Sequence, residues 1–152
     1  MTPISPTIAT PPEPPLKPDA GLHVQLLPSG WPRPKGYSNG VLVRGGMIFI
    51  GGQIGWNASG QFAATLVEQI EQTLRNIVSV LTEGGGTPED LVRLTWYVLD
   101  IETYAAEGKA IGRVYRAVMG TAYPPMSLVQ VVRLVETAAL VEIEATAVLP
   151  HA

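Results

Sequence analysis

The clearest pattern along the chain is an apolar stripe with helical spacing between residues 65 and 83. Thr65 and Glu68 have the spacing of a capping box, in which each side chain bonds to the other residue's backbone N–H. The Gly84–Gly86 run that follows lacks the Lys and Ser/Thr of a phosphate loop, so we expect it to end the helix. The stripe comprises Leu66, Ile70, Leu74, Ile77, Val78 and Leu81.

Shorter apolar or alternating segments on both sides of this helix predict the strands of a sheet. Two apolar runs around Gly45-Gly46 are typical of a β-hairpin. The later segments are rich in β-branched and aromatic residues and alternate with polar ones. The predicted strands are 23–27, 41–44, 47–50, 91–99, 126–134 and 139–149, with a second helix over 103–119.

The order of these elements is β-β-β-α-β-α-β-β, which predicts an α+β fold with two helices on one face of a mixed six-stranded sheet. The strands predicted over 91–99 and 126–132 carry large apolar groups on both faces. Two helices can cover only one face, so we expect another copy of the chain to bury the other. Leu128 and Val132 are predicted to lie on that second, buried face.

The first 20 residues differ in composition from the rest of the chain. Proline lacks a backbone N–H and cannot complete helix or sheet hydrogen bonding, so the segment predicts a mobile tail. We expect a tail over 1–20, one folded domain over 21–150 and, because no signal peptide is visible, a cytoplasmic location. Half of the 14 prolines lie in the tail: Pro3, Pro6, Pro11, Pro12, Pro14, Pro15 and Pro18.

Charge and composition exclude several classes of function. The net charge of −3 argues against a duplex-binding surface, which needs clustered Lys and Arg. The absence of cysteine excludes disulfides and thiolate nucleophiles, and His23 and His151 are too far apart in sequence to suggest a zinc site or a Ser-His-Asp triad. No apolar run reaches the roughly 18 residues that a membrane span requires. We expect no cofactor, no nucleic-acid partner and no membrane partner.

Three motifs in order carry a resemblance to a known family. They are the Tyr-centred loop Gly36–Gly40, the Gly-Gln strand Met47–Ile54 and the segment Val141–Ala145, with sequence VEIEA. From Leu22 to Leu149 the chain resembles the Rid family (YjgF/YER057c/UK114) of enamine/imine deaminase-like proteins. The resemblance implies a chorismate-mutase-like fold, a homotrimer around a barrel of sheets, and small-molecule clefts between subunits.

The resemblance also shows where this chain departs from the family's pattern. Members that hydrolyse 2-imino acids bind the substrate carboxylate with an Arg in a PxRS motif, because a guanidinium donates two parallel hydrogen bonds to a carboxylate. Met126 stands at that position here, within Pro124–Ser127. Gly112 replaces an assisting Asn, and Leu128 replaces a Cys. The chain therefore resembles the branches that lack the substrate-binding Arg.

Other family positions are retained. The resemblance assigns Glu142 to orienting or activating water, Tyr37 to the catalytic cleft, and the Gly51-Gly52 backbone to facing the substrate. In the predicted final strand, Glu142 faces away from the apolar positions, and burial at an interface would raise its pKa. The alternative is a structural ion pair between Glu142 and Arg93 or Arg133.

The remaining candidates are aromatic and basic side chains. Tyr37 lies near Trp31, Arg33 and Lys35, a combination that can line a pocket for an anionic or aromatic ligand, and Arg33 is the candidate substitute for the missing carboxylate clamp. Trp56, together with Met126 and Leu128, would make the cleft broader and more apolar. The competing interpretation makes Trp56 a core or interface residue.

The sequence therefore predicts a hydrolase acting on the C–N bond of a reactive enamine or imine, as in metabolite repair. Water oriented by Glu142 would attack the electron-poor carbon. Because the Arg is missing, we expect a substrate other than a simple 2-imino acid. The alternative is a non-catalytic trimer that binds a small metabolite in the same clefts.

Overall fold

The computed structural model of the chain describes residues 23–35, 37–43 and 46–150. The predicted tail, His151, and Arg44 and Gly45 of the predicted hairpin lie outside these residues. The elements are β1 (His23–Leu26), β2 (Gly40–Val43), β3 (Met47–Ile54), α1 (Leu66–Glu83), the 3-10 helix η1 (Pro88–Asp90), β4 (Leu91–Val98), α2 (Ile101–Ala106), α3 (Gly108–Met119), β5 (Met126–Gln130) and β6 (Val141–Val148).

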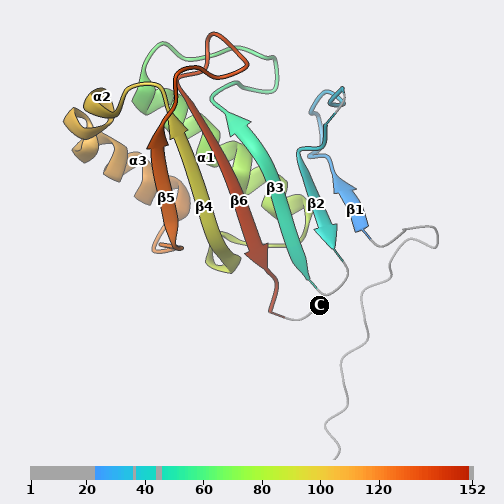
Figure 1. The fold of residues 1–152 in the computed structure, drawn as a ribbon. Coiled ribbons are helices and arrows are strands. Elements are labelled where there is room, and N and C mark those ends of the chain that lie inside the picture. Colours follow the sequence, from blue (N-terminus) through green and yellow to red (C-terminus); the bar gives the residue numbers. More distant parts are fainter. Residues whose placement is uncertain (1–22, 36, 44–45, 151–152) are drawn as a thin grey trace, which may run out of the picture.

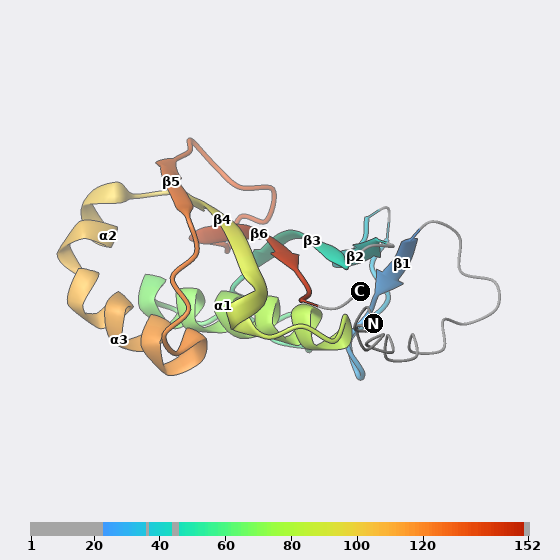
Figure 2. The ribbon, with the colours of Figure 1, turned by 90° about the horizontal axis from the view of Figure 1, so that it is seen from below.

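The strands form one mixed sheet in the order β1-β2-β3-β6-β4-β5 (Figure 1). All neighbours are antiparallel except β4 and β5, which are parallel and joined by α2 and α3. Seen along the sheet, all three α-helices lie on the same side of it (Figure 2). The predicted α+β fold, with its six strands and its helices on one face, is confirmed.

Helix α1 begins and ends where the sequence predicts. The backbone N–H of Glu68 donates to Thr65 Oγ1 at 3.3 Å, and the Glu68 carboxylate accepts from the Thr65 N–H at 3.2 Å. At the other end, the Gly84 N–H donates to the carbonyls of Val80 and Leu81, which ends the helix. The capping box and the glycine stop are both confirmed.

The second predicted helix is divided into α2 and α3. Asp100 accepts hydrogen bonds from the N–H groups of Glu102 and Thr103, so the helix begins before the predicted residue 103. Glu107 separates the two helices, and α3 begins at Gly108. Glycine is a poor helix former, and the break falls beside the first of the two glycines in this stretch.

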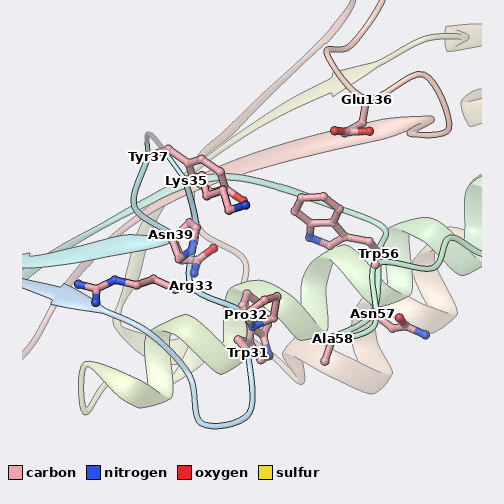
Figure 3. A pocket seen from close by; sticks show the side chains of 12 residues that line it. Trp31, Pro32, Arg33, Lys35, Tyr37, Asn39, Trp56, Asn57, Ala58 and Glu136 are labelled. Atoms are coloured by element: carbon pink, nitrogen blue, oxygen red, sulfur yellow. The ribbon is translucent and has the colours of Figure 1, made fainter.

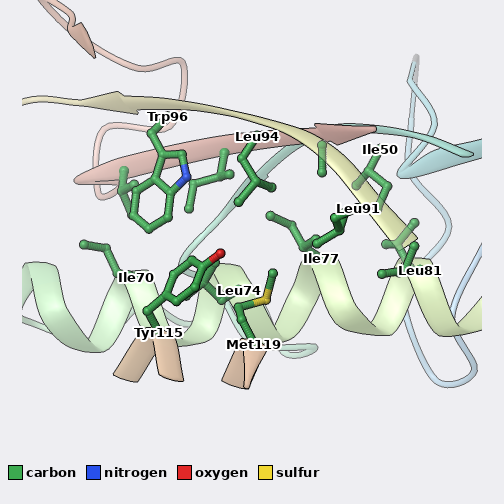
Figure 4. Close-up of a cluster of buried hydrophobic side chains, with 14 of the residues drawn as sticks. Ile50, Ile70, Leu74, Ile77, Leu81, Leu91, Leu94, Trp96, Tyr115 and Met119 are labelled. Atoms are coloured by element: carbon green, nitrogen blue, oxygen red, sulfur yellow. The ribbon is translucent and has the colours of Figure 1, made fainter. Parts of the chain in front are cut away.

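The core lies between the sheet and the helices (Figure 4). Trp96 is fully buried there, stacked on Tyr115 with 6.4 Å between ring centroids. Leu128 pairs with Trp96 across β4 and β5 and packs against this core, so the prediction that it faces a partner subunit is wrong. Val132 is fully exposed in a loop, because the chain leaves the sheet after the Val131 N–H donates to the Val98 carbonyl.

None of the described helices covers the opposite face of the sheet, and we call it the open face. Cross-strand partners define it, because residues opposite each other share a face. Phe49 and Val129 are 46% and 45% exposed on it. The open face carries Phe49, Arg93, Thr95, Tyr97, Val129, Glu142, Glu144 and Thr146.

Candidate functional site

The carboxylate of Glu142 lies against the backbone of Gly52. Glu142 is half-buried on β6 and pairs with Ile54 of β3 and Tyr97 of β4. A β-bulge between Ile50 and Gln53 interrupts the β3–β6 register beside it. A side-chain carbon at Gly52 would collide with the Glu142 carboxylate. The glycine therefore leaves the space that the carboxylate occupies.

Hydrogen bonds from a buried glutamine hold the bulge in place. Gln53 Nε2 donates to the carbonyls of Gly51 at 3.1 Å and Gly52 at 3.5 Å, and to that of Asn39 at 3.5 Å. The Gly51 N–H donates to the same Asn39 carbonyl at 2.9 Å. The backbone beside Glu142 is thus fixed to the loop that precedes β2.

The surroundings of Glu142 favour its protonated form. Burial raises the pKa of the Glu142 carboxyl above its ordinary value, and the negative charge of Glu144 raises it further. Within the described residues the Glu142 carboxylate forms no ion pair, so the predicted alternative partners Arg93 and Arg133 do not neutralise it within one chain. A carboxylate with a raised pKa and no fixed cation is suited to exchanging a proton with water.

Glu144 differs from Glu142 in its hydrogen bonding. The Tyr97 hydroxyl donates to Glu144 Oε1 at 3.1 Å. Loss of hydration and this neighbouring carboxylate raise the pKa of Tyr97, which keeps the hydroxyl protonated as a donor. Of the two carboxylates on the open face, Glu142 is therefore the one whose side chain has no hydrogen-bond partner in the described part of the chain.

A second group of candidates lines a surface cavity of about 340 Å³ (Figure 3). We call it the indole cavity, because two of its walls are Trp31 and Trp56. The structure brings Tyr37 and Arg33 together with both indoles here, although Trp56 is distant from them in sequence. The lining residues are Trp31, Pro32, Arg33, Pro34, Lys35, Tyr37, Asn39, Trp56, Asn57, Ala58, Gly60 and Glu136.

Trp56 is neither a core residue nor fully exposed. Its carbonyl accepts a hydrogen bond from Asn76 Nδ2 of α1 at 2.9 Å, and the same amide donates to the Ile54 carbonyl at 2.9 Å. Its ring lies 6.1 Å from that of Phe62, tilted by 44°. Helix α1 therefore fixes the backbone that directs the indole toward the cavity.

Sequence reasoning did not select Asn39 and Glu136 for this site. Asn39 is only 5% exposed and belongs to the Tyr-centred loop, so its motif could have identified it. Glu136 lies in the long loop before β6. No local pattern marks it, because only the folded chain brings that loop to the cavity.

Met126 and Leu128 lie apart from both groups. They belong to the edge strand β5, which β4 separates from the strand of Glu142. They pair with Leu94 and Trp96, on the helix side of the sheet, although Met126 remains 45% exposed. Gly112 lies on the exposed surface of α3 with open space around it. One chain therefore does not bring these positions to Glu142.

Similarity to known proteins agrees with this architecture. Residues 32–149 match the family model described as endoribonuclease L-PSP. A solved relative of this fold, YyfA of Yersinia pestis, is described as a member of the conserved Rid protein family; it is 28% identical, with a TM-score of 0.72 over 84% of this chain and 99% of its own. This chain belongs to the Rid family. The predicted family is confirmed.

Further relatives of this Rid-family chain include a RutC family protein of Haemophilus influenzae, 34% identical over 105 residues, or 68% of this chain and 80% of that protein. TdcF of Escherichia coli, which is named as a reactive intermediate deaminase, is 30% identical over 105 residues, or 68% of this chain and 80% of TdcF. The crystal structure of E. coli TdcF with bound serine has a TM-score of 0.72 and 27% identity, covering 83% of this chain and 98% of TdcF.

Among the described residues, no helix is both long and apolar enough to span a membrane.

Proposed function

We propose that this protein is a deaminase that hydrolyses a reactive enamine or imine in a cleft that includes Glu142. The observation that carries the proposal is the half-buried Glu142 carboxylate, which lies against Gly52, has a raised pKa and forms no ion pair with a described residue. Its similarity to TdcF, named as a reactive intermediate deaminase, supports the same reaction class.

An enamine first takes up a proton on carbon to become the protonated imine. In the proposed reaction, Glu142 accepts a proton from a water molecule as the water oxygen bonds to the carbon of the protonated imine, which gives a neutral amino alcohol. Glu142 then returns that proton to the nitrogen as the C–N bond breaks, and the hydroxyl oxygen releases its own proton to solvent, so the products are a carbonyl compound and ammonia. Because imine hydrolysis is intrinsically easy, positioning and one carboxylate are sufficient.

The proposed cleft lies between subunits of a homotrimer. Phe49 and Val129 are exposed apolar side chains on the open face, and nothing in the described chain covers them. Met126 is half-exposed on the edge strand β5, and in the proposed trimer it contributes to a neighbour's site. Its thioether cannot make the paired hydrogen bonds of a guanidinium, so the proposed substrate is not a simple 2-imino acid.

An RNA substrate, which the description of the family model would suggest, is disfavoured in this chain. The net charge is −3, and two carboxylates, Glu142 and Glu144, lie on the open face. RNA binding needs clustered cations that neutralise phosphates.

The second candidate is a trimer that binds a small metabolite without turnover. It is favoured by the indole cavity, which is built from aromatic and charged side chains but does not include Glu142 among its lining residues. In both candidates the ligand is a small molecule.

Glu142→Gln separates the two candidates, because it keeps the shape of the side chain but cannot accept a proton. Hydrolysis of freshly generated imines is measured as ammonia release, with ligand binding measured in parallel. A deaminase loses turnover in Glu142→Gln and keeps most of it in the matched variant Glu144→Gln. Equal turnover in Glu142→Gln and the unmodified protein would contradict the proposal.

A further inference from the structure

The indole cavity has rigid aromatic walls. Trp31 packs against the hydrophobic core, and its backbone N–H donates to the Pro28 carbonyl at 3.1 Å. The opposite wall, Trp56, is held through its carbonyl by Asn76. Flat apolar walls that are fixed before binding favour a flat ligand, because little conformational freedom remains to be lost. The volume of about 340 Å³ fits one ring with short substituents.

Two opposite charges line the cavity near Trp56. In Figure 3 the ammonium of Lys35 points toward the indole of Trp56, and the carboxylate of Glu136 lies farther from Lys35, beyond that indole in this view. Neither charge forms an ion pair with any residue that the structure describes. The guanidinium of Arg33 extends away from Trp56 in the same view. Lys35, rather than the predicted Arg33, is therefore the cation available to a ligand.

A buried amide adds a directional polar group. Asn39 lines the cavity, is 95% buried, and its side chain forms no hydrogen bond to a described residue. Its backbone carbonyl, by contrast, accepts bonds from Gly51 and Gln53. The Asn39 side-chain amide is thus a polar group of the cavity wall that can donate to or accept from a ligand.

We infer that the indole cavity binds a planar, conjugated molecule that carries a carboxylate at the Lys35 end and a basic nitrogen at the Glu136 end. The inference goes beyond the proposed function, because the residues that line the indole cavity do not include Glu142. It identifies Lys35 as the residue that receives the ligand carboxylate, and Glu136 as the partner of the ligand nitrogen. Both indoles stack on the conjugated part of the molecule.

Binding is tested without turnover, by isothermal titration calorimetry on the full chain. The main probe is 4-(aminomethyl)benzoate, which carries both charges on a flat ring. Its saturated analogue, trans-4-(aminomethyl)cyclohexanecarboxylate, has the same charges and no aromatic face. Benzoate and benzylamine each carry one of the charges. We expect the main probe to bind at least tenfold more tightly than the other three.

Variants assign each contact. Lys35→Met should lower the affinity for 4-(aminomethyl)benzoate and for benzoate about tenfold, and should change the affinity for benzylamine by less than twofold. Glu136→Gln should lower the affinity for 4-(aminomethyl)benzoate and for benzylamine but not for benzoate. Trp56→Leu should abolish the preference for the aromatic ring over the saturated one. The matched control is Lys109→Met, an exposed lysine of α3 outside the cavity, which should leave all four affinities unchanged. Circular dichroism checks that each variant is folded.

Several results would overturn the inference. The first is equal binding of the aromatic and saturated probes. The second is loss of benzoate binding in Arg33→Met but not in Lys35→Met. The third is tighter binding of adenosine monophosphate than of 4-(aminomethyl)benzoate. The last result would indicate a nucleotide ligand. None of the probes is a substrate, so the binding test and the turnover test fail independently. If the probes do not bind as expected, the proposed hydrolysis by Glu142 still stands. If the protein binds the probes as expected but hydrolyses no imine, the inference about the indole cavity still stands.

Discussion

The carboxylate of Glu142 occupies the space that a side chain at Gly52 would fill. The contact joins two strands, because Glu142 lies on β6 and Gly52 on the bulged end of β3. A substitution at Gly52 therefore changes the position of the proposed catalytic group without removing it.

Gly52→Ala should displace the Glu142 carboxylate and reduce turnover nearly as much as Glu142→Gln does. The free energy of unfolding should fall by about 1 kcal/mol, because the atoms that must move are Cγ and the carboxyl group of one flexible side chain. Turnover and urea denaturation measure the two effects separately.

The control for this substitution is Gly112→Ala, on the exposed surface of α3 with nothing within 4 Å of the added carbon. Replacing glycine by alanine within a helix should stabilise the protein by about 0.5–1 kcal/mol and leave turnover unchanged. Full activity in Gly52→Ala would show that the position of Glu142 does not matter for the reaction.

The pH dependence of turnover should follow the raised pKa of Glu142. The ionised carboxylate is the form that accepts a proton, so activity should rise with pH through a value above the ordinary 4.5 of Glu. Glu144→Gln removes the neighbouring negative charge and should move this acidic limb to lower pH. If the acidic limb of the pH–activity profile does not move in Glu144→Gln, the charge of Glu144 does not affect the titrating group.

The same raised pKa has a consequence for stability. Between the unfolded and the folded pKa, the folded chain binds more protons than the unfolded one, so the free energy of unfolding falls as pH rises through this window. Glu142→Gln should therefore raise the melting temperature at neutral pH, and the difference should disappear below the unfolded pKa. Thermal denaturation over a pH series measures it.

A charge on the open face should prevent assembly. Val129→Lys places an ammonium beside Tyr97, on the face that the proposed homotrimer buries, where the loss of its hydration is costly. Sedimentation velocity should show a trimer for the unmodified protein and smaller species for the variant. Ala117→Lys, on the exposed surface of α3, is the control and should remain trimeric. A monomeric unmodified protein at micromolar concentration would contradict the proposed assembly.

Gln69 should be a strong determinant of stability. Its side chain donates to the carbonyls of Ala63 and Ala138, at 3.0 and 2.9 Å, and accepts from the Leu140 N–H at 2.8 Å. Gln69→Leu leaves these three groups unpaired and should cost about 2–4 kcal/mol. Gln25→Leu, on the exposed strand β1, is the control and should change stability by less than about 0.5 kcal/mol. Urea denaturation tests both, and equal losses would contradict the role of Gln69.

The sequence predicted elements whose signals are local. The capping box at Thr65 and Glu68 fixes the start of α1 through contacts within one turn, and the hairpin of β2 and β3 needs only its apolar runs and a glycine turn. At that turn Gly46 has a φ of 79°, which glycine adopts without strain. Periodicity also placed Glu142 on the opposite face from Val141 and Ile143.

Features that depend on distant segments were not predictable. The end of β5 depends on where its neighbour β4 ends at Val98, and Leu128 faces the core because it pairs with Trp96. Glu136 reaches the indole cavity through a loop whose path is held by Gln69. The roles of Lys35 and Arg33 differ only in the direction of two long side chains, which spacing along the chain does not encode.

Met126 should limit the range of substrates. The unmodified protein should be poor on 2-iminopropionate, because Met126 replaces the guanidinium that would receive its carboxylate. Met126→Arg should restore part of the activity, since Met126 is 45% exposed and the longer side chain can reach solvent or a neighbouring subunit. A charge-assisted hydrogen bond contributes about 1.5–3 kcal/mol, or about one to two decades in rate if it forms in the transition state.

Met126→Lys is the matched variant for this gain. An ammonium supplies the same charge but not two parallel hydrogen bonds, so it should restore less activity than Met126→Arg. Recovery in Met126→Arg should stay incomplete, because Gly112 and Leu128 also depart from the family's pattern. All three proteins are assayed on the same freshly generated 2-iminopropionate. The unmodified protein could instead hydrolyse 2-iminopropionate efficiently, with no change in Met126→Arg. That result would mean that the carboxylate is recognised elsewhere. Lys35 would then be the first residue to substitute, because its ammonium already points into a cavity.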